Sequence, residues 1–172
     1  MRFSCRENLD IQVHKHPHHQ SLNKKLMEDF YKLPFVSYED RTSHTNIKGK
    51  KISFVNNPGV VKPEGIILIE QWVKQLINTE KVEINFNTWA ACLDKGQETV
   101  EHDHYPLCTM VYVYFVNTPK GSSPLVFPTS GKKVKAEAGT LVIAPSTLRH
   151  KVPTNKCDYR VTIASNIIVT EK

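Results

Sequence analysis

Apolar residues recur at helical spacing in two stretches of the first half of the chain. The first stretch follows Ser21, a residue type that often caps a helix N-terminus, and Pro34 is expected to end it. Its apolar positions are Leu22, Leu26, Phe30 and Leu33. A second helix is predicted over about residues 63–78, with a buried stripe of Ile69, Trp72 or Val73, and Leu76 or Ile77. Both patterns are typical of amphipathic helices that cover one face of a core.

From residue 82 onward the hydrophobic period becomes that of strands. Val82, Ile84 and Phe86 alternate with polar residues, and residues 89–93 are expected to continue this strand. The longest apolar run, CTMVYVYFV at 108–116, is rich in Tyr and Val, which favour strands. Further strands are predicted at 125–127, 140–144, 148–152 and 160–169, with turns at 117–124 and 130–133. Many short strands separated by turns predict an all-β sandwich or barrel with the two helices packed outside.

The length of 172 residues predicts a single domain, 1–172, with a helical and loop-rich part (1–80) before a β core (82–169). Residues 34–63 hold several Pro and Gly residues and predict a long loop, which in compact domains often forms a lid or binds substrate. Lys48, Lys50 and Lys51 form a small basic cluster there that is expected to be solvated. His44, in the same loop, is given no role.

Composition and charge narrow the functional classes. No apolar run approaches the ~20 residues that span a membrane, and the N-terminus lacks the apolar core of a signal peptide, so we expect a cytoplasmic protein. The 23 basic and 17 acidic residues give a net charge of +6, which suits an anionic substrate or co-substrate and does not by itself indicate nucleic-acid binding. No two of the four cysteines form a CxxC motif, and all four are expected to be reduced. They are Cys5, Cys92, Cys108 and Cys157.

Histidines dominate the candidate chemistry. His102 and His104 flank Asp103 just before the long apolar run, and in an extended strand residues i and i+2 point to the same side. The two imidazoles could therefore grip one metal ion, with His150 as the third ligand from a neighbouring strand. His150 is expected to share a face with Leu148 and Val152, while Arg149 and Lys151 point outward. The histidines of residues 14–19 surround Pro17 without regular spacing and predict a surface segment rather than a second metal site.

Arg160 is the candidate anion-binding residue. In the run YRVTIASN, Arg160, Thr162 and Ala164 share one face of a strand, and Val161 and Ile163 share the other. An arginine that points into a β core is too costly to leave unpaired, and a carboxylate bound bidentately is the fitting partner, with the Thr162 hydroxyl as an extra donor. An internal Asp or Glu partner, or a guanidinium that reaches water at a strand end, would explain the same pattern.

These motifs, in this order, resemble the 2-oxoglutarate/Fe(II)-dependent oxygenases. The resemblance runs over about residues 82–168 and is carried by a glycine before an HxH motif, a later Pro-Ser segment before a histidine, and an arginine-containing strand. Its elements are Gly96, His102-Asp103-His104, the strand of Tyr112 and Tyr114, residues 125–128, residues 138–146, His150 and residues 160–166. The resemblance implies a mainly β double-stranded β-helix, also called a jelly roll and cupin-like, with flanking N-terminal helices.

The resemblance also implies roles for these residues. His102 and His150 match the two iron-binding histidines, and Arg160, with Thr162 beside it, matches the arginine that holds the distal carboxylate of 2-oxoglutarate. A tyrosine on the strand after the HxH motif often adds a hydrogen bond there, and Tyr114 is expected before Tyr112. The implied activity is a 2-oxoglutarate-dependent dioxygenase, with Fe(II) as cofactor and 2-oxoglutarate and O2 as co-substrates, that hydroxylates an unknown primary substrate.

One position departs from the family pattern. Most members carry a carboxylate where this chain has His104, so the predicted centre is His102, His104 and His150. Asp103 is an alternative ligand if a bulge turns it inward. Three histidines also suit zinc. A cupin-type metal enzyme, or a metal-binding β-sandwich without 2-oxoglutarate dependence, is the alternative function, although neither gives Arg160 and Thr162 a role.

Overall fold

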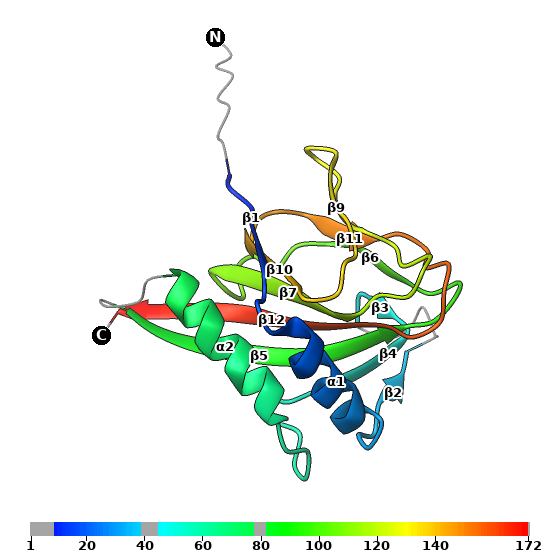
Figure 1. Ribbon diagram of the computed structural model, residues 1–172. Coiled ribbons are helices and arrows are strands. Elements are labelled where there is room, and N and C mark those ends of the chain that lie inside the picture. The colour runs from blue at the N-terminus through cyan, green and yellow to red at the C-terminus, as the bar shows by residue number, and fades with distance from the viewer. Residues whose placement is uncertain (1–8, 39–44, 78–81, 172) are drawn as a thin grey trace.

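The computed structural model describes residues 9–38, 45–77 and 82–171 (Figure 1), so Cys5 and His44 lie outside the described residues. The helices are α1 (His19–Phe30) and α2 (Glu64–Ile77). The strands are β1 (Gln12–Lys15), β2 (Val36–Ser37), β3 (Ile47–Lys48), β4 (Lys50–Ser53), β5 (Val82–Leu93), β6 (Glu98–His102), β7 (Met110–Asn117), β8 (Leu125–Phe127), β9 (Lys132–Val134), β10 (Thr140–Pro145), β11 (His150–Val152) and β12 (Arg160–Glu171).

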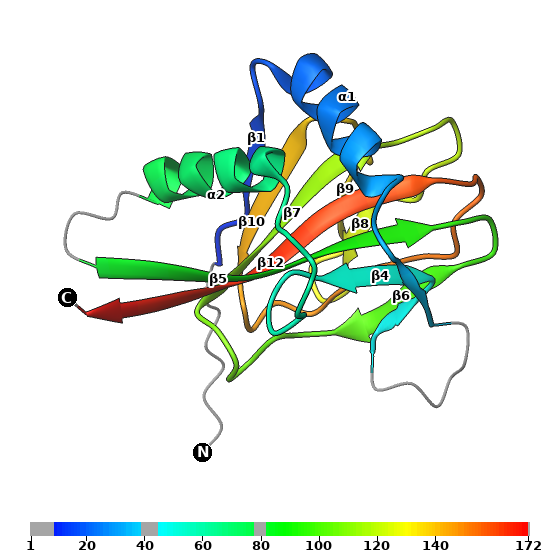
Figure 2. The same cartoon turned by 90° about the horizontal axis from the view of Figure 1, so that it is seen from below.

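Two antiparallel sheets form the core of the fold. The larger has seven strands in the order β1-β10-β7-β12-β5-β4-β2, and the smaller has five in the order β3-β6-β11-β8-β9. Both helices lie on one side of the large sheet, and Figure 2 shows them together over that face. The predicted mainly β jelly roll with flanking helices is confirmed.

Each face of the large sheet buries its own hydrophobic core. One core lies between the helices and the sheet, where Leu26 of α1 and Ile69 of α2 pack with Ile163 of β12. The other lies between the two sheets, where Phe115 of β7 packs with Phe127 of β8. Strand alternation assigns residues to these cores, because neighbours along a strand point to opposite faces.

The helix predictions are confirmed except at their ends. α1 begins at His19, two residues before the predicted cap, and the Ser21 hydroxyl donates a hydrogen bond to the His18 carbonyl inside the first turn. Leu22, Leu26 and Phe30 are buried as predicted. α2 ends at Ile77, and no helix of the described residues is long and apolar enough to cross a membrane.

The segment predicted as a loop, 34–63, contains the short strands β2, β3 and β4. They escaped prediction because two to four residues are too few to display a period. β4 pairs with β5 and β3 pairs with β6, so this segment supplies strands to both sheets. Strand β9 likewise replaces part of the turn expected at 130–133.

Candidate metal centre and anion pocket

His102 and His150 face each other from the adjacent strands β6 and β11. They are directly paired in the register, and their ring centroids are 4.5 Å apart. The Nδ1 atom of His102 lies 2.8 Å from the Val100 carbonyl oxygen, and that of His150 lies 2.9 Å from the Leu148 carbonyl oxygen. A carbonyl oxygen only accepts, so each Nδ1 carries the proton. Each Nε2 is therefore left with a free lone pair, as a metal ligand requires.

His104 joins this pair from a turn. Strand β6 ends at His102, so the prediction that His102 and His104 share one strand is wrong. His104 is fixed instead by its backbone N–H, which donates to the Ser146 carbonyl oxygen at 2.9 Å. Its ring is nearly parallel to that of His150, with centroids 5.2 Å apart. One candidate ligand nitrogen from each of the three histidines lies within 4.8 Å of the others.

Burial keeps these imidazoles neutral. Burial, with a smaller effect from His102 on both rings and from His150 on His104, lowers the pKa of His104 and of His150 to about 4. The pKa of His102 is also lowered, mainly by burial. A neutral imidazole is the form that binds a metal, so the cluster has its ligands ready at neutral pH.

Asp103 turns away from the three ring nitrogens. Its Oδ1 accepts a hydrogen bond from the backbone N–H of Tyr105, and its Oδ2 lies 3.6 Å from Nη1 of Arg149. Arg149 and Lys151 point outward as predicted, and both pair with Glu101. Asp103 is therefore not brought to the cluster as an alternative ligand.

Asn166 is a residue that the sequence reasoning missed. Its side chain approaches His104 closely enough to oppose the fall in the pKa of that ring. Its Oδ1 is buried and has no well-aligned hydrogen-bond partner among the described residues. His102 and His150 use backbone carbonyls for the ring nitrogen that faces away from the cluster, whereas the Asn166 side chain lies near the His104 ring. The sequence offered one signal for Asn166. It lies six residues after Arg160 on β12, and an even spacing places both side chains on the same face of a strand.

Arg160 carries a buried guanidinium at the start of β12. The residue is 1% exposed, its Nε donates to the Ser123 carbonyl oxygen at 3.0 Å, and its Nη2 has no hydrogen-bond partner among the residues that the structure describes. No Asp or Glu of the described residues forms an ion pair with it, and burial lowers its pKa to about 10. Both alternative explanations for this arginine, an internal acid and a water-exposed head, therefore fail within the described part of the chain.

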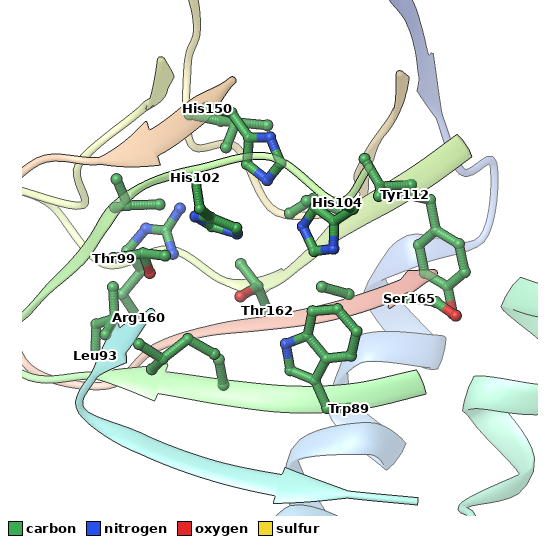
Figure 3. Close-up of a pocket in the computed structure, with 17 residues that line it drawn as sticks. Trp89, Leu93, Thr99, His102, His104, Tyr112, His150, Arg160, Thr162 and Ser165 are labelled. Atoms are coloured by element: carbon green, nitrogen blue, oxygen red, sulfur yellow. The ribbon is translucent and has the colours of Figure 1, made fainter. Parts of the chain in front are cut away.

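Arg160 and the three histidines line one cavity between the sheets (Figure 3). Thr162 and Ala164 line it too, as the predicted parity requires, while Val161 and Ile163 pack beneath the helices. Trp89 also lines the cavity, and its ring stacks on that of His104 with centroids 6.0 Å apart. The sequence identified Trp89 only as part of a strand.

The two predicted tyrosines do not present their hydroxyls to this cavity. Tyr114 packs in the core beneath the helices, and its hydroxyl donates to Oδ1 of Asn23 on α1 at 2.7 Å. Tyr112 borders the cavity, but its ring packs against Phe86 in the same helix-side core (Figure 3). The even-numbered residues of β7 face the helices, so the expectation that Tyr114 contacts the co-substrate is wrong.

The N-terminal histidines lie apart from this cavity. His16 packs edge-on against Trp72 of α2, with ring centroids 4.8 Å apart. Within residues 9–38, 45–77 and 82–171, the three cavity histidines are the one group with metal-ligating spacing. Residues 14–19 are half-buried or exposed, which confirms the prediction of a surface segment.

The donor set fits a divalent metal ion and a bound dicarboxylate. Three neutral imidazoles from converging elements suit iron or zinc. The unpaired Nη2 of Arg160 is a buried donor that lacks an acceptor. A carboxylate in the cavity would supply that acceptor and a counter-charge.

Comparison with known proteins supports the fold. No protein-family model and no curated protein matches the sequence. Among solved structures, the chain is similar to a viral collagen prolyl hydroxylase from Paramecium Bursaria Chlorella virus-1 in complex with 2-oxoglutarate, with a TM-score of 0.67 and 16% identity over 91% of this chain and 94% of that one. A Pseudomonas putida prolyl-4-hydroxylase gives a TM-score of 0.69 and 18% identity over 93% and 91%.

A third similar structure is the Trichoplax adhaerens prolyl hydroxylase in complex with a peptide fragment of the hypoxia inducible factor oxygen degradation domain. Its TM-score is 0.69, with 14% identity over 92% of this chain and 83% of that one. At these identities the likeness concerns the fold. The chain therefore has the jelly-roll fold of these hydroxylases over nearly its whole length.

Proposed function

We propose that this protein is a 2-oxoglutarate-dependent dioxygenase, a non-haem iron enzyme that couples decarboxylation of 2-oxoglutarate to the oxidation of a primary substrate. The observation that carries the proposal is the buried, unpaired Nη2 of Arg160 on the same cavity as the three-histidine cluster. A metal site alone would fit many proteins. A metal site beside a buried arginine that lacks an acid partner fits a co-substrate that bears a carboxylate.

The proposal gives each side chain a task. His102, His104 and His150 would hold Fe(II), which, when bound, supplies the chemistry of O2 activation. Arg160 would bind the distal carboxylate of 2-oxoglutarate, with the Thr162 hydroxyl as a second donor. Because the guanidinium is almost fully buried, water competes little for this ion pair.

The three-histidine donor set changes the charge of the centre. Two histidines and one carboxylate would leave Fe(II) with one net positive charge, whereas three neutral imidazoles leave both charges of the ion. That surplus favours a dianionic co-substrate electrostatically. It also makes zinc a competing occupant, which is why the metal must be controlled in any assay.

The proposal also covers the domain organisation of the chain and its cellular compartment. All 172 residues would form one oxygenase domain, with a small-molecule co-substrate and a primary substrate still to be identified. The described cysteines, Cys92, Cys108 and Cys157, are free, which fits a reducing compartment such as the cytoplasm. Such a compartment would also keep iron in the ferrous state.

Anaerobic addition of Fe(II) and 2-oxoglutarate tests the proposal. We expect a weak visible charge-transfer band when both are present, and succinate formation after air is admitted. Arg160→Ala should weaken 2-oxoglutarate binding by roughly tenfold or more, because a bidentate charge-assisted contact is lost. Arg149→Ala is the matched control, since Arg149 is half-exposed and pairs with Glu101.

The outcome that contradicts the proposal is equally specific. If no band forms, no succinate appears in air, and Arg160→Ala binds 2-oxoglutarate as the wild type does, the dioxygenase assignment is wrong. Stoichiometric zinc that resists exchange by iron would instead favour a metal-binding β-sandwich without 2-oxoglutarate dependence.

A further inference from the structure

Lys51 lies on the cavity side of the large sheet. On β4, Lys51 pairs with Ala91 and Ser53 pairs with Trp89. Ala91 and Trp89 belong to β5 and line the cavity. The intervening Ile52 is buried beneath the helices. Because side chains alternate along a strand, Lys51 points to the face opposite Ile52. Its Nζ lies 4.9 Å from the centroid of the Trp89 ring.

The ammonium of Lys51 is partly buried without an acid partner. Burial lowers its pKa, and no carboxylate of the described residues forms an ion pair with it. The neighbouring Lys50 is the contrast, because its Nζ lies 2.9 Å from Asp94 Oδ2 and its pKa is raised. The expectation that Lys51 is solvated therefore holds only in part, because the side chain is half-buried. The indole compensates only part of the lost hydration, since a cation–π contact is weaker than the hydration of a free ammonium.

Trp89 adjoins the histidine cluster, and Lys51 adjoins Trp89. Trp89 stacks on the His104 ring at an interplanar angle of 20°, and the Nζ of Lys51 lies over the Trp89 ring. Both Lys51 and Trp89 are partly exposed, so a molecule entering from solvent can meet them. A ligand beside the metal centre would thus contact an aromatic face and an ammonium together.

The charges around the cavity leave room for a further anion. With the proposed occupants bound, a metal dication, Arg160 and Lys51 exceed the two negative charges of 2-oxoglutarate, and the imidazoles add none. The nearby carboxylates of Asp103 and Glu101 are engaged by Arg149. The net charge at the centre therefore remains positive, which favours an anionic second ligand.

We propose that Lys51 and Trp89 form the primary-substrate subsite, and that the primary substrate bears a carboxylate held by Lys51 and an apolar group that packs on Trp89. The inference rests on the proposed function for the identity of the reaction and for the charge balance, whereas the contact between Lys51 and Trp89 does not depend on it. A single ammonium on a flexible stem suits a carboxylate that approaches from solvent, whereas the rigid fork of Arg160 suits one fixed dicarboxylate. The carboxylate could belong to a free acylated amino acid or to the C-terminal residue of a peptide.

Matched acid and amide probes test the subsite on the full-length, metal-free chain. N-acetylleucine and N-acetylleucinamide share an apolar body and differ in the carboxylate. Titrations are followed by the indole N–H signals in ¹H–¹⁵N spectra, and Trp89→Phe assigns them, since the chain has two tryptophans. We expect saturable shifts of the Trp89 signal, with the acid binding roughly tenfold more tightly than the amide. Trp72, which contacts His16 away from the cavity, serves as the internal reference.

Variants of Lys51 and Lys50 test which lysine causes the preference for the acid over the amide. Lys51→Met should abolish the difference between acid and amide, and Lys51→Arg should retain it. Lys50→Met is the matched control, because Lys50 pairs with Asp94 and should leave the preference unchanged. A leucine-terminated peptide acid and its amide, titrated in parallel, distinguish a peptide source from a free amino acid, according to which acid binds more tightly.

Three results would overturn the subsite: equal binding of acid and amide, an acid preference that survives Lys51→Met, or no saturable shift with either acid up to its solubility. None of these readouts requires iron or 2-oxoglutarate. If the acid binds more tightly but no succinate forms, the subsite is retained and the dioxygenase chemistry is rejected. If succinate forms but acid and amide bind equally, the dioxygenase chemistry is retained and the subsite is rejected.

Discussion

His102 and His150 are opposed across the β6–β11 pair, and each donates its Nδ1–H to the carbonyl oxygen of the residue two positions earlier. The two rings therefore repeat one local geometry on neighbouring strands, and their orientation is set by backbone. Among the described residues, the ring of His104 has no such bond to a backbone carbonyl, and the residue is held through its own backbone N–H, which donates to the Ser146 carbonyl oxygen. The candidate centre thus combines two ligands fixed by a sheet with one held by a turn.

Loss of any one of the three histidines should weaken metal binding. His102→Ala and His150→Ala each remove one nitrogen, and we expect a fall in affinity of about a hundredfold or more for Zn(II) by isothermal calorimetry. His104→Ala should act in the same direction. His18→Ala is the control, because His18 is exposed and lies outside the cavity. Wild-type affinity in His104→Ala would remove His104 from the ligand set.

Replacement of His104 by aspartate tests the charge of the centre. His104→Asp provides two histidines and one carboxylate, which is the facial triad typical of non-haem iron. We expect this variant to bind Fe(II) anaerobically more tightly than His104→Ala does. Equal affinity of the two variants would show that a carboxylate at position 104 does not reach the metal.

Stability of the metal-free protein should decline in mildly acidic solution. The pKa values of His104 and His150 fall from 6.5 in the unfolded chain to about 4 in the fold, so the unfolded chain takes up protons first as the pH falls. Their contribution is complete above about pH 6.5 and is lost progressively toward pH 4. Urea unfolding of the wild type and of the double variant His104→Ala/His150→Ala measures it, and the double variant should depend less on pH in this window. Parallel pH profiles would contradict the prediction.

Tyr114→Phe should affect stability and leave co-substrate binding intact. The change leaves the buried Oδ1 of Asn23 without its donor, which costs about 1–3 kcal/mol in the free energy of unfolding. Tyr112→Phe is the matched variant, because the Tyr112 hydroxyl is buried without a hydrogen-bond partner and its removal should cost less. Urea unfolding and 2-oxoglutarate calorimetry separate the two effects. Weaker 2-oxoglutarate binding in Tyr114→Phe at unchanged stability would restore the role that the sequence resemblance implied.

Asn166→Ala should lower metal affinity through His104. Partners that orient ligating histidines typically contribute 10–100-fold to metal affinity, and we expect a loss near the lower end of that range. Nitrogen chemical shifts of the His104 ring, measured without metal, should report a changed balance between its two tautomers. Asn87→Ala is the control, because Asn87 is exposed and directly opposite Asn166 in the sheet. Unchanged His104 shifts in Asn166→Ala would rule out the positioning role.

Sequence reasoning succeeded where local periodicity decides the structure. The alternation in β12 correctly separated Arg160 and Thr162 from Val161 and Ile163, and the helical stripe of α1 was buried as predicted. It failed where tertiary contacts decide. The burial of both faces of β7 gives no alternation in polarity, so nothing in the run CTMVYVYFV indicates which face meets the helices.

The same limit applies to single contacts. Just after the end of β6, the backbone N–H of His104 donates to the carbonyl oxygen of Ser146, which is remote in sequence. The approach of Lys51 to Trp89 depends on the pairing of β4 with β5. A strand of four residues is too short for its pairing partner to be predicted from the sequence. Such contacts between distant segments are not visible in a pattern of neighbouring residues.

The two ends of the cavity belong to different sheets, with the histidines carried by or adjoining the small sheet and Arg160 on the large one. Stacked sheets keep a nearly constant separation of about 10 Å, and β12 is paired on both sides, with β5 and with β7. If the cavity binds 2-oxoglutarate as proposed, this fixed separation would select dicarboxylates by their length. A shorter keto diacid such as oxaloacetate would then bind more weakly, because it would contact the metal and the guanidinium less well at the same time.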